Sequence, residues 1–172
     1  MPRTTSADEV ALLTNTGCSI SRETISPGTS GGLAWIFYFA RDYASALIEL
    51  QRAVLLDPNF HQTYFYLGQV YERMGKDEET VEAGAKSDAL AGRVKTEQID
   101  AEREAFRTGG MPAYWRTRAA RAVIRPARKV FSDAKHHARL GETGKALEML
   151  EKAHAAREAE MPWLNVFPMF DN

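Results

Sequence analysis

The sequence predicts an all-α fold, a short right-handed α-solenoid built from stacked helical hairpins. Leu33 and Leu67 begin similar stretches 34 residues apart, which is the length of one helix–turn–helix unit in such proteins. Between them apolar side chains recur at helical spacing, and Pro58 and Gly75 stand where helices are expected to end. Since each hairpin buries its apolar face against the next, repeated hairpins predict a continuous core.

The length and composition are those of an ordinary globular chain. The 172 residues are 44% hydrophobic and 26% charged, which excludes a composition typical of intrinsic disorder. They suffice for one compact domain or about four or five hairpins. The net charge of −1 excludes a chain that binds nucleic acid or membranes as a uniform polycation.

The compartment is predicted from the cysteine content and the N-terminus. Cys18 is the only cysteine, which excludes an internal disulfide and fits a reducing environment. Asp8 and Glu9 precede a short apolar run at residues 10–13, a pattern unlike that of a secretory signal. No apolar run approaches the roughly 20 residues of a membrane span. We therefore expect a cytoplasmic protein with no membrane partner.

Two regions of the chain differ in pattern. Residues 1–30 are rich in Ser and Thr without sustained periodicity, and the stretch SPGTSGG at 26–32 is typical of a flexible lead-in. We expect a flexible N-terminal segment at 1–30 and a helical repeat domain at 31–172. The tail at 161–172 is aromatic and contains two prolines, and it is expected to pack in extended form over the last hairpin.

Two hairpins are expected in the first half of the repeat domain. Their helices span about residues 33–40 and 43–56, then about 60–74 and 78–90. The first helix is apolar on nearly every side and is expected to be buried, whereas the second is amphipathic. Gly68 in the third helix permits a close crossing against its neighbour.

The middle pair of helices is predicted to be degenerate. An acidic helix at about 94–106 is expected to end near Gly110, and another begins at Pro112, a favoured first-turn residue. The spacing around Ala46 returns around Ala146, 100 residues later, close to three periods of 34. Three full periods would take 102 residues, so the two missing residues indicate that the intervening pair of helices is atypical.

The spacing from Leu33 to Gly75 resembles that of the tetratricopeptide repeat family. Three stretches together resemble the C-terminal repeat region of large bacterial regulators: FARDYASALIELQRAVLLDPNFHQTYFYLGQVYERMGK, AFRTGGMPAYWRTR and ARLGETGKALEMLEKAHAAREAEMPWLNVFPMFD. In those proteins the repeats follow a winged-helix DNA-binding domain, a serine/threonine kinase domain or a nucleotide-cyclase domain. The resemblance covers about residues 33–171. It implies a non-catalytic interaction module, regulatory or scaffolding, whose partner is a protein or peptide.

The chain departs from the family pattern in two places. Thr80 stands where a small alanine is expected, and Gly84 stands where the family has a large side chain. An interior glycine costs a helix about 1 kcal/mol relative to alanine, so we expect a weaker packing joint there. Tyr66 and Gln69 occupy the neighbourhood where chaperone-binding repeats need asparagine, which disfavours a chaperone-tail ligand.

In the family the first helix of each pair lines the inner face, which predicts a partner-binding groove on the third helix. His61, Phe65, Gln69 and Arg73 recur there at four-residue intervals and so form one stripe. Such a stripe can contact a peptide. The alternative is that a neighbouring helix covers it.

A run of positive charge in the second half predicts a basic surface. Its members are Arg116, Arg118, Arg121, Arg125, Arg128 and Lys129, followed by Lys135 and Arg139, against Asp133 alone. Such a surface suits an acidic protein or, less well, nucleic acid in a transcriptional regulator fragment. The favoured alternative is that these arginines form a solvated helix face that pairs with the acidic helix beside it.

No catalytic, cofactor or metal site is predicted, and we expect no enzyme. His136 and His137 are adjacent and point about 100° apart on a helix, so they chelate one metal poorly. His137 is instead expected to be buried and hydrogen-bonded. The carboxylate clusters lie at a helix start or on exposed faces, and no glycine-rich phosphate loop is present. A small-molecule sensor remains a further alternative.

Overall fold

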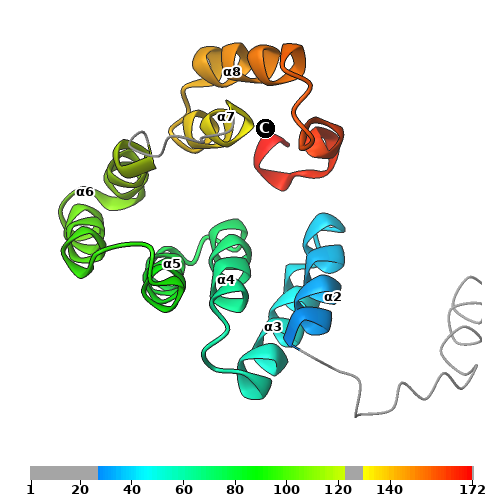
Figure 1. Cartoon of the computed structure of the whole chain (residues 1–172), viewed down its shortest axis with the longest axis vertical. Helices are drawn as coiled ribbons and strands as arrows, with labels where there is room; N and C mark the ends of the chain where they lie inside the picture. Colours follow the sequence, from blue (N-terminus) through cyan, green and yellow to red (C-terminus); the bar gives the residue numbers. More distant parts are fainter. Residues whose placement is uncertain (1–26, 123–129, 172) are drawn as a thin grey trace, which may run out of the picture.

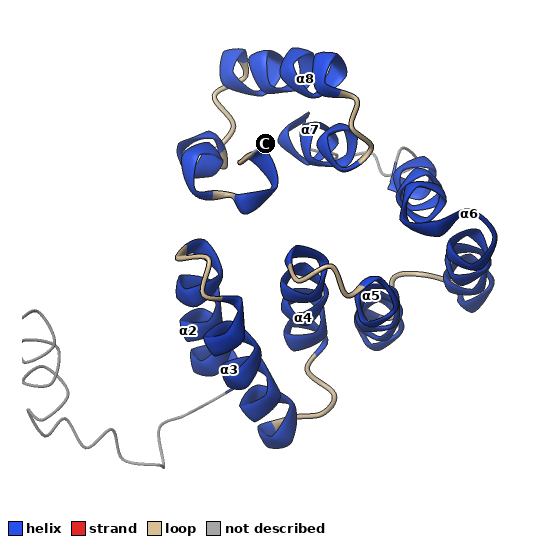
Figure 2. Ribbon diagram, turned by 180° about the vertical axis from the view of Figure 1, so that it is seen from behind, coloured by secondary structure: helices blue, strands red, loops and turns tan. Residues whose placement is uncertain are grey.

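The computed structural model describes residues 27–122 and 130–171. These residues form helices and turns without a strand, which confirms the predicted all-α class (Figure 2). The elements in chain order are α2 (Pro27–Phe39), α3 (Tyr43–Leu56), α4 (His61–Arg73), α5 (Asp77–Ala91), α6 (Thr96–Ala122), α7 (Val130–Arg139), α8 (Thr143–Ala155), and the 3-10 helices η2 (Met161–Val166) and η3 (Pro168–Phe170).

The helices pack in neighbouring pairs, α2 with α3, α4 with α5, and α7 with α8. Figure 1 shows them following one another along a curved path, with the C-terminal end on its inner side near α7. Each pair is joined by a tight turn that contains a residue with left-handed φ, namely Arg41, Gly75 and Gly141.

The first hairpin begins earlier than the sequence predicts. Helix α2 starts at Pro27 and not near Leu33, so the end of the expected flexible lead-in is helical. Proline suits the first turn of a helix because its φ is already helical. Gly31 is buried against α4, where an added Cβ would lie 3.3 Å from the ring of Tyr66. By contrast, the predicted bounds of α3 are confirmed, and the side chain of Asp42 caps its N-terminus.

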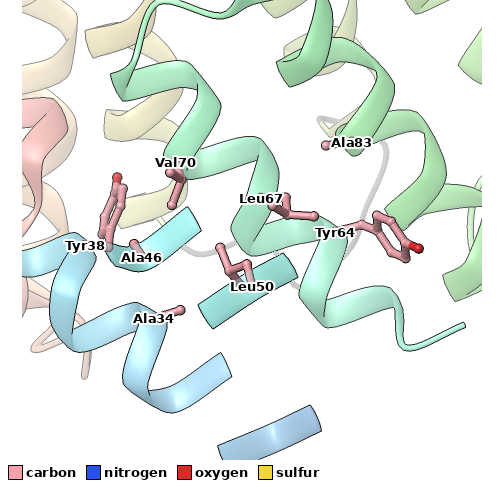
Figure 3. Packing of buried hydrophobic residues seen from close by; sticks show 8 residues of the cluster. All are labelled: Ala34, Tyr38, Ala46, Leu50, Tyr64, Leu67, Val70 and Ala83. Atoms are coloured by element: carbon pink, nitrogen blue, oxygen red, sulfur yellow. The ribbon is translucent and has the colours of Figure 1, made fainter. Parts of the chain in front are cut away.

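The main core lies between α2, α3, α4 and α5. Leu50 of α3 is fully buried between α2 and α4, and Tyr38 of α2 is buried beside Ala46 of α3 (Figure 3). Burying a leucine or similar side chain contributes about 1.5–3 kcal/mol. The buried cluster comprises Ala34, Tyr38, Ala46, Leu50, Tyr64, Leu67, Val70 and Ala83.

Helix α6 consists of two helices joined at a sharp break. Gly110 has φ 65° and ψ −163°, a conformation that is essentially restricted to glycine. Pro112 follows within the first turn of the second half, so the predicted end and restart of the helix are confirmed. The second half then carries Tyr114 and Trp115 into a buried cluster with Val81 of α5.

This second half of α6 explains the departures at Thr80 and Gly84. A Cβ at Gly84 would lie 2.6 Å from the hydroxyl oxygen of Tyr114, so glycine makes room for that side chain. Thr80 is buried and its hydroxyl donates to the carbonyl of Lys76 at 2.8 Å. The expectation of a weak packing joint is therefore wrong, because a residue distant in sequence fills the space.

Candidate functional site

The four predicted groove residues lie along one face of α4 and line three adjoining cavities. His61 and Phe65 line a cavity of about 370 Å³, Phe65 and Gln69 line one of about 200 Å³, and Arg73 lines one of about 280 Å³. The first two cavities share Phe65, and the last two share Trp115 and Arg139. The three cavities, here together named the α4 groove, are lined by residues of α4, α5, the second half of α6 and α7.

Phe65 is the apolar centre of this groove. Its side chain is 43% exposed although it borders two cavities. Polar groups surround it: the Ser87 hydroxyl donates to the carbonyl of His61 at 3.0 Å, and Gln69 lies one turn further along α4. An exposed aromatic ring between polar walls is a typical anchor point for a partner side chain.

A buried ion pair between α4 and α7 lies where the second and third cavities of the groove adjoin. Arg139 donates from Nε and Nη2 to the two carboxylate oxygens of Glu72 at 2.7 and 2.8 Å, and from Nη2 to Gln69 at 3.1 Å. Its guanidinium stacks 4.4 Å from the ring centroid of Trp115. Burial acts to raise the pKa of Glu72, but Arg139 and Arg73 outweigh it, and the pKa lies below its ordinary value.

A second buried ion cluster joins α5 to both halves of α6. Arg118 Nη1 lies 2.9 Å from Glu102 and 3.0 Å from Asp88, and it also donates to the Tyr114 hydroxyl at 3.1 Å. Arg121 contacts the same two carboxylates, at 3.1 Å from Glu102 and 3.0 Å from Asp88. Glu102 is only 2% exposed. Burial raises its pKa, and the two arginines offset part of that rise.

These pairs correct the predicted basic surface. Arg118 and Arg121 do not present free charge, because the break at Gly110 turns them toward Glu102 on the acidic half of the same helix. The predicted pairing with the acidic helix is confirmed, but the solvated face is wrong for Arg118 and Arg121, whose side chains are only 17% and 19% exposed. Arg139 is likewise buried against Glu72.

The other residues of the predicted basic surface lie in different surroundings. Arg116 is exposed on α6. Lys135 lies over the rings of Phe131 and Phe167, with Nζ 5.5 and 5.3 Å from their centroids. Arg125, Arg128 and Lys129 lie outside the described residues.

The sequence did not predict the path of the C-terminal segment, defined as residues 161–171. It forms η2 and η3, so the expected extended form is wrong, but it does pack on α7 of the last hairpin and it also returns to α2. Arg41 binds both carboxylate oxygens of Asp171, and its Nη1 donates to the Val166 carbonyl at 2.8 Å. One signal was available in the sequence, since Arg41 occupies the turn position that holds Gly75 and Gly141 in the later hairpins.

The histidine pair has structural roles. His137 Nδ1 lies 2.7 Å from Glu142, which confirms the predicted hydrogen bond, although the His137 side chain is only partly buried. His136 Nδ1 lies 2.7 Å from the carbonyl of Ser132. Within the described ranges, no group of three or more His, Cys, Asp or Glu side chains is placed to hold a metal ion. Cys18 lies outside those ranges.

Comparison with protein-family models, with curated proteins and with solved structures gave no match. Over the part of the chain that the structure describes, every helix is too short or too polar to cross a membrane. The candidate site therefore rests on the geometry of the α4 groove.

Proposed function

We propose that this chain is a non-catalytic protein–protein interaction module, a tetratricopeptide-type scaffold with a right-handed solenoid. Its role is regulatory, in a bacterial cytoplasm, and its ligand is an extended segment of a protein partner bound in the α4 groove. One observation carries the proposal: His61, Phe65, Gln69 and Arg73, placed in one stripe by the sequence, line adjoining cavities. The pairwise packing of the helices supports the scaffold class.

The walls of the groove are suited to binding without rearrangement. The Arg139–Glu72 pair ties α7 to α4, and the Arg118–Glu102 pair ties the halves of α6 together. A preorganised surface loses little conformational entropy when a ligand binds. Phe65 then supplies apolar contact, while Ser87 and Gln69 border the cavities with polar groups.

The test is affinity capture with the full chain as bait, in three versions. Phe65→Ala removes the apolar centre of the groove. Ile48→Ala is the matched control, because Ile48 is a similarly exposed apolar residue, 51% exposed, on α3 outside the groove. A partner retained by the wild type and by Ile48→Ala, and lost with Phe65→Ala, is the expected result. Equal capture by all three versions would place the binding surface elsewhere.

A second candidate, a small-molecule sensor, is favoured by a separate cavity of about 530 Å³ between α4, α5 and the first half of α6. Its lining includes Tyr64, Leu67 and Ile99, and its volume falls within the usual range for small-molecule sites. A ligand there would raise the midpoint of thermal unfolding. Ile99→Trp, which fills the cavity, should abolish that rise while leaving capture by the α4 groove intact.

The nucleic-acid alternative has less support. Arg118 and Arg121 are paired with Asp88 and Glu102, so they release few counterions on binding a phosphate backbone. The nucleic-acid alternative would be supported if the chain bound duplex DNA at low salt with an affinity that fell steeply as the salt concentration rose.

A further inference from the structure

The turn between α2 and α3 contains an arginine where a glycine is conformationally favoured. Arg41 has φ 64°, close to the 67° and 69° of Gly75 and Gly141 in the corresponding turns. Left-handed φ is unfavourable for a residue that carries a Cβ. The contacts of the Arg41 side chain offset this cost.

Arg41 holds the C-terminal segment at several points. Nε donates to Oδ2 of Asp171 at 2.9 Å and Nη2 donates to Oδ1, a two-point contact that matches the planar guanidinium to the carboxylate. Nη1 donates to the Val166 carbonyl at 2.8 Å. Arg41 thus binds a side-chain carboxylate and a backbone carbonyl of the segment, as in a complex between a protein and a peptide.

Aromatic side chains complete the binding surface. The ring of Phe167 lies 5.5 Å from that of Phe39 on α2 and 5.7 Å from that of Phe131 on α7. Trp35 of α2 also borders it, at 6.3 Å. Trp163 stacks on Phe39 at 5.9 Å while its own side chain stays half exposed. Aromatic anchors of this kind dominate the energy of many interfaces.

The C-terminal segment also reaches the α4 groove. Arg73, the last residue of the predicted stripe, donates from Nη1 to the Pro168 carbonyl at 3.5 Å. Met169 lines the same cavity as Arg73 and Trp115. The segment therefore covers the Arg73 end of the groove, whereas Phe65, which borders the other two cavities, stays exposed.

We propose that residues 161–171 are an intramolecular ligand of the interaction surface, which a partner peptide of the same chemistry displaces. That peptide carries aromatic residues with a carboxylate about four positions after the central phenylalanine, as Phe167 and Asp171 do. The inference rests on the proposed function, because the displaced segment lies at one end of the groove used there. The segment is tethered by residues 156–160, so it competes at a high effective concentration.

The test uses a synthetic peptide, MPWLNVFPMFD, amidated at its C-terminus and labelled with a fluorophore at its N-terminus. Asp171→Lys in the full chain weakens the tethered segment and leaves Arg41 in place. We expect fluorescence anisotropy to show at least about tenfold tighter binding to this variant than to the wild type. Glu151→Lys, a charge reversal of an exposed residue on α8, is the matched control and should bind as weakly as the wild type.

Two further arms establish which contacts matter. Adding Arg41→Ala to Asp171→Lys should remove the binding, and so should a peptide whose final aspartate is replaced by lysine. If the peptide does not bind to a folded Asp171→Lys chain, the segment is a fixed part of the fold and the proposal fails. Such a failure together with Phe65-dependent capture would leave the proposed function intact.

Hydrogen exchange on the wild type keeps the test independent of whether the variant folds. Amides of residues 161–171 should exchange faster than those of the α3 core, and excess unlabelled peptide should speed them further while protecting α2. Exchange of both regions at one common rate, unchanged by peptide, would overturn the proposal.

Discussion

Arg41 and Asp171 are 130 residues apart in sequence and form a two-point ion pair that joins the turn after α2 to the end of the described chain. This ion pair links the C-terminal segment to the first hairpin, so it joins the two ends of the curved path of helices. Arg41 itself has a left-handed φ of 64°. Arg41 therefore destabilises the turn through its backbone conformation and stabilises the fold through its contact with Asp171.

The two effects can be separated by comparing Arg41→Gly with Arg41→Ala. Both changes remove the contacts to Asp171, but only glycine relieves the left-handed backbone. Arg41→Gly should therefore be more stable than Arg41→Ala by about 1 kcal/mol. Urea unfolding followed by circular dichroism measures the difference, and Gly75→Ala, at the corresponding turn, should lose a similar amount. Equal stability of the two Arg41 variants would show that the turn is not strained.

Gly84→Ala should destabilise the protein by about 1–3 kcal/mol, because its Cβ would lie 2.6 Å from the hydroxyl oxygen of Tyr114. Gly144→Ala on α8 is the matched control. Nothing lies within 4 Å of the Cβ position there, so helix propensity should raise its stability by up to about 1 kcal/mol. Thermal unfolding compares the two. A stabilised Gly84→Ala protein would contradict the contact with Tyr114.

Arg118→Ala should cost about 3–5 kcal/mol, since it leaves the buried Glu102 carboxylate without its closest partner. Arg116→Ala, on the exposed side of α6, should change stability by less than about 0.5 kcal/mol. Denaturant midpoints of the two variants test the assignment of Arg118 to the interior. Similar small losses would restore the basic-surface interpretation.

The Glu72–Arg139 pair predicts a pH dependence of stability. The folded-state pKa of Glu72 lies below its ordinary value of 4.5, so its stabilisation is fully present above that value. It is lost as the pH falls through the lowered folded-state pKa. Glu72→Gln should therefore cost about 3 kcal/mol at pH 7, and the difference from the wild type should shrink toward pH 3.

The measurement is the free energy of unfolding at several pH values for the wild type and Glu72→Gln. The raised pKa of Glu102 acts in both proteins and cancels in the difference. Glu151→Gln, an exposed carboxylate on α8, serves as the control and should track the wild type. A gap that stays constant from pH 7 to pH 3 would show that Glu72 is not the titrating group.

The sequence by itself determined the helices and most of their ends. The bounds of α3 and the break in α6 were predicted because caps, prolines and glycines act within one or two turns. The stripe from His61 to Arg73 was predicted because helical periodicity alone places those side chains on one face. Each of these signals is local, so an isolated stretch of sequence contains it.

Only the tertiary structure decided which distant residues meet. Glu102 receives Arg118 because the chain reverses at Gly110, Gly84 admits Tyr114 from another helix, and Asp171 returns to Arg41. Periodicity shows which side of a helix a residue occupies but not which partner that side will face. The loss of Arg118 from the predicted basic surface and the covering of the Arg73 end of the groove by the C-terminal segment follow from such long-range contacts.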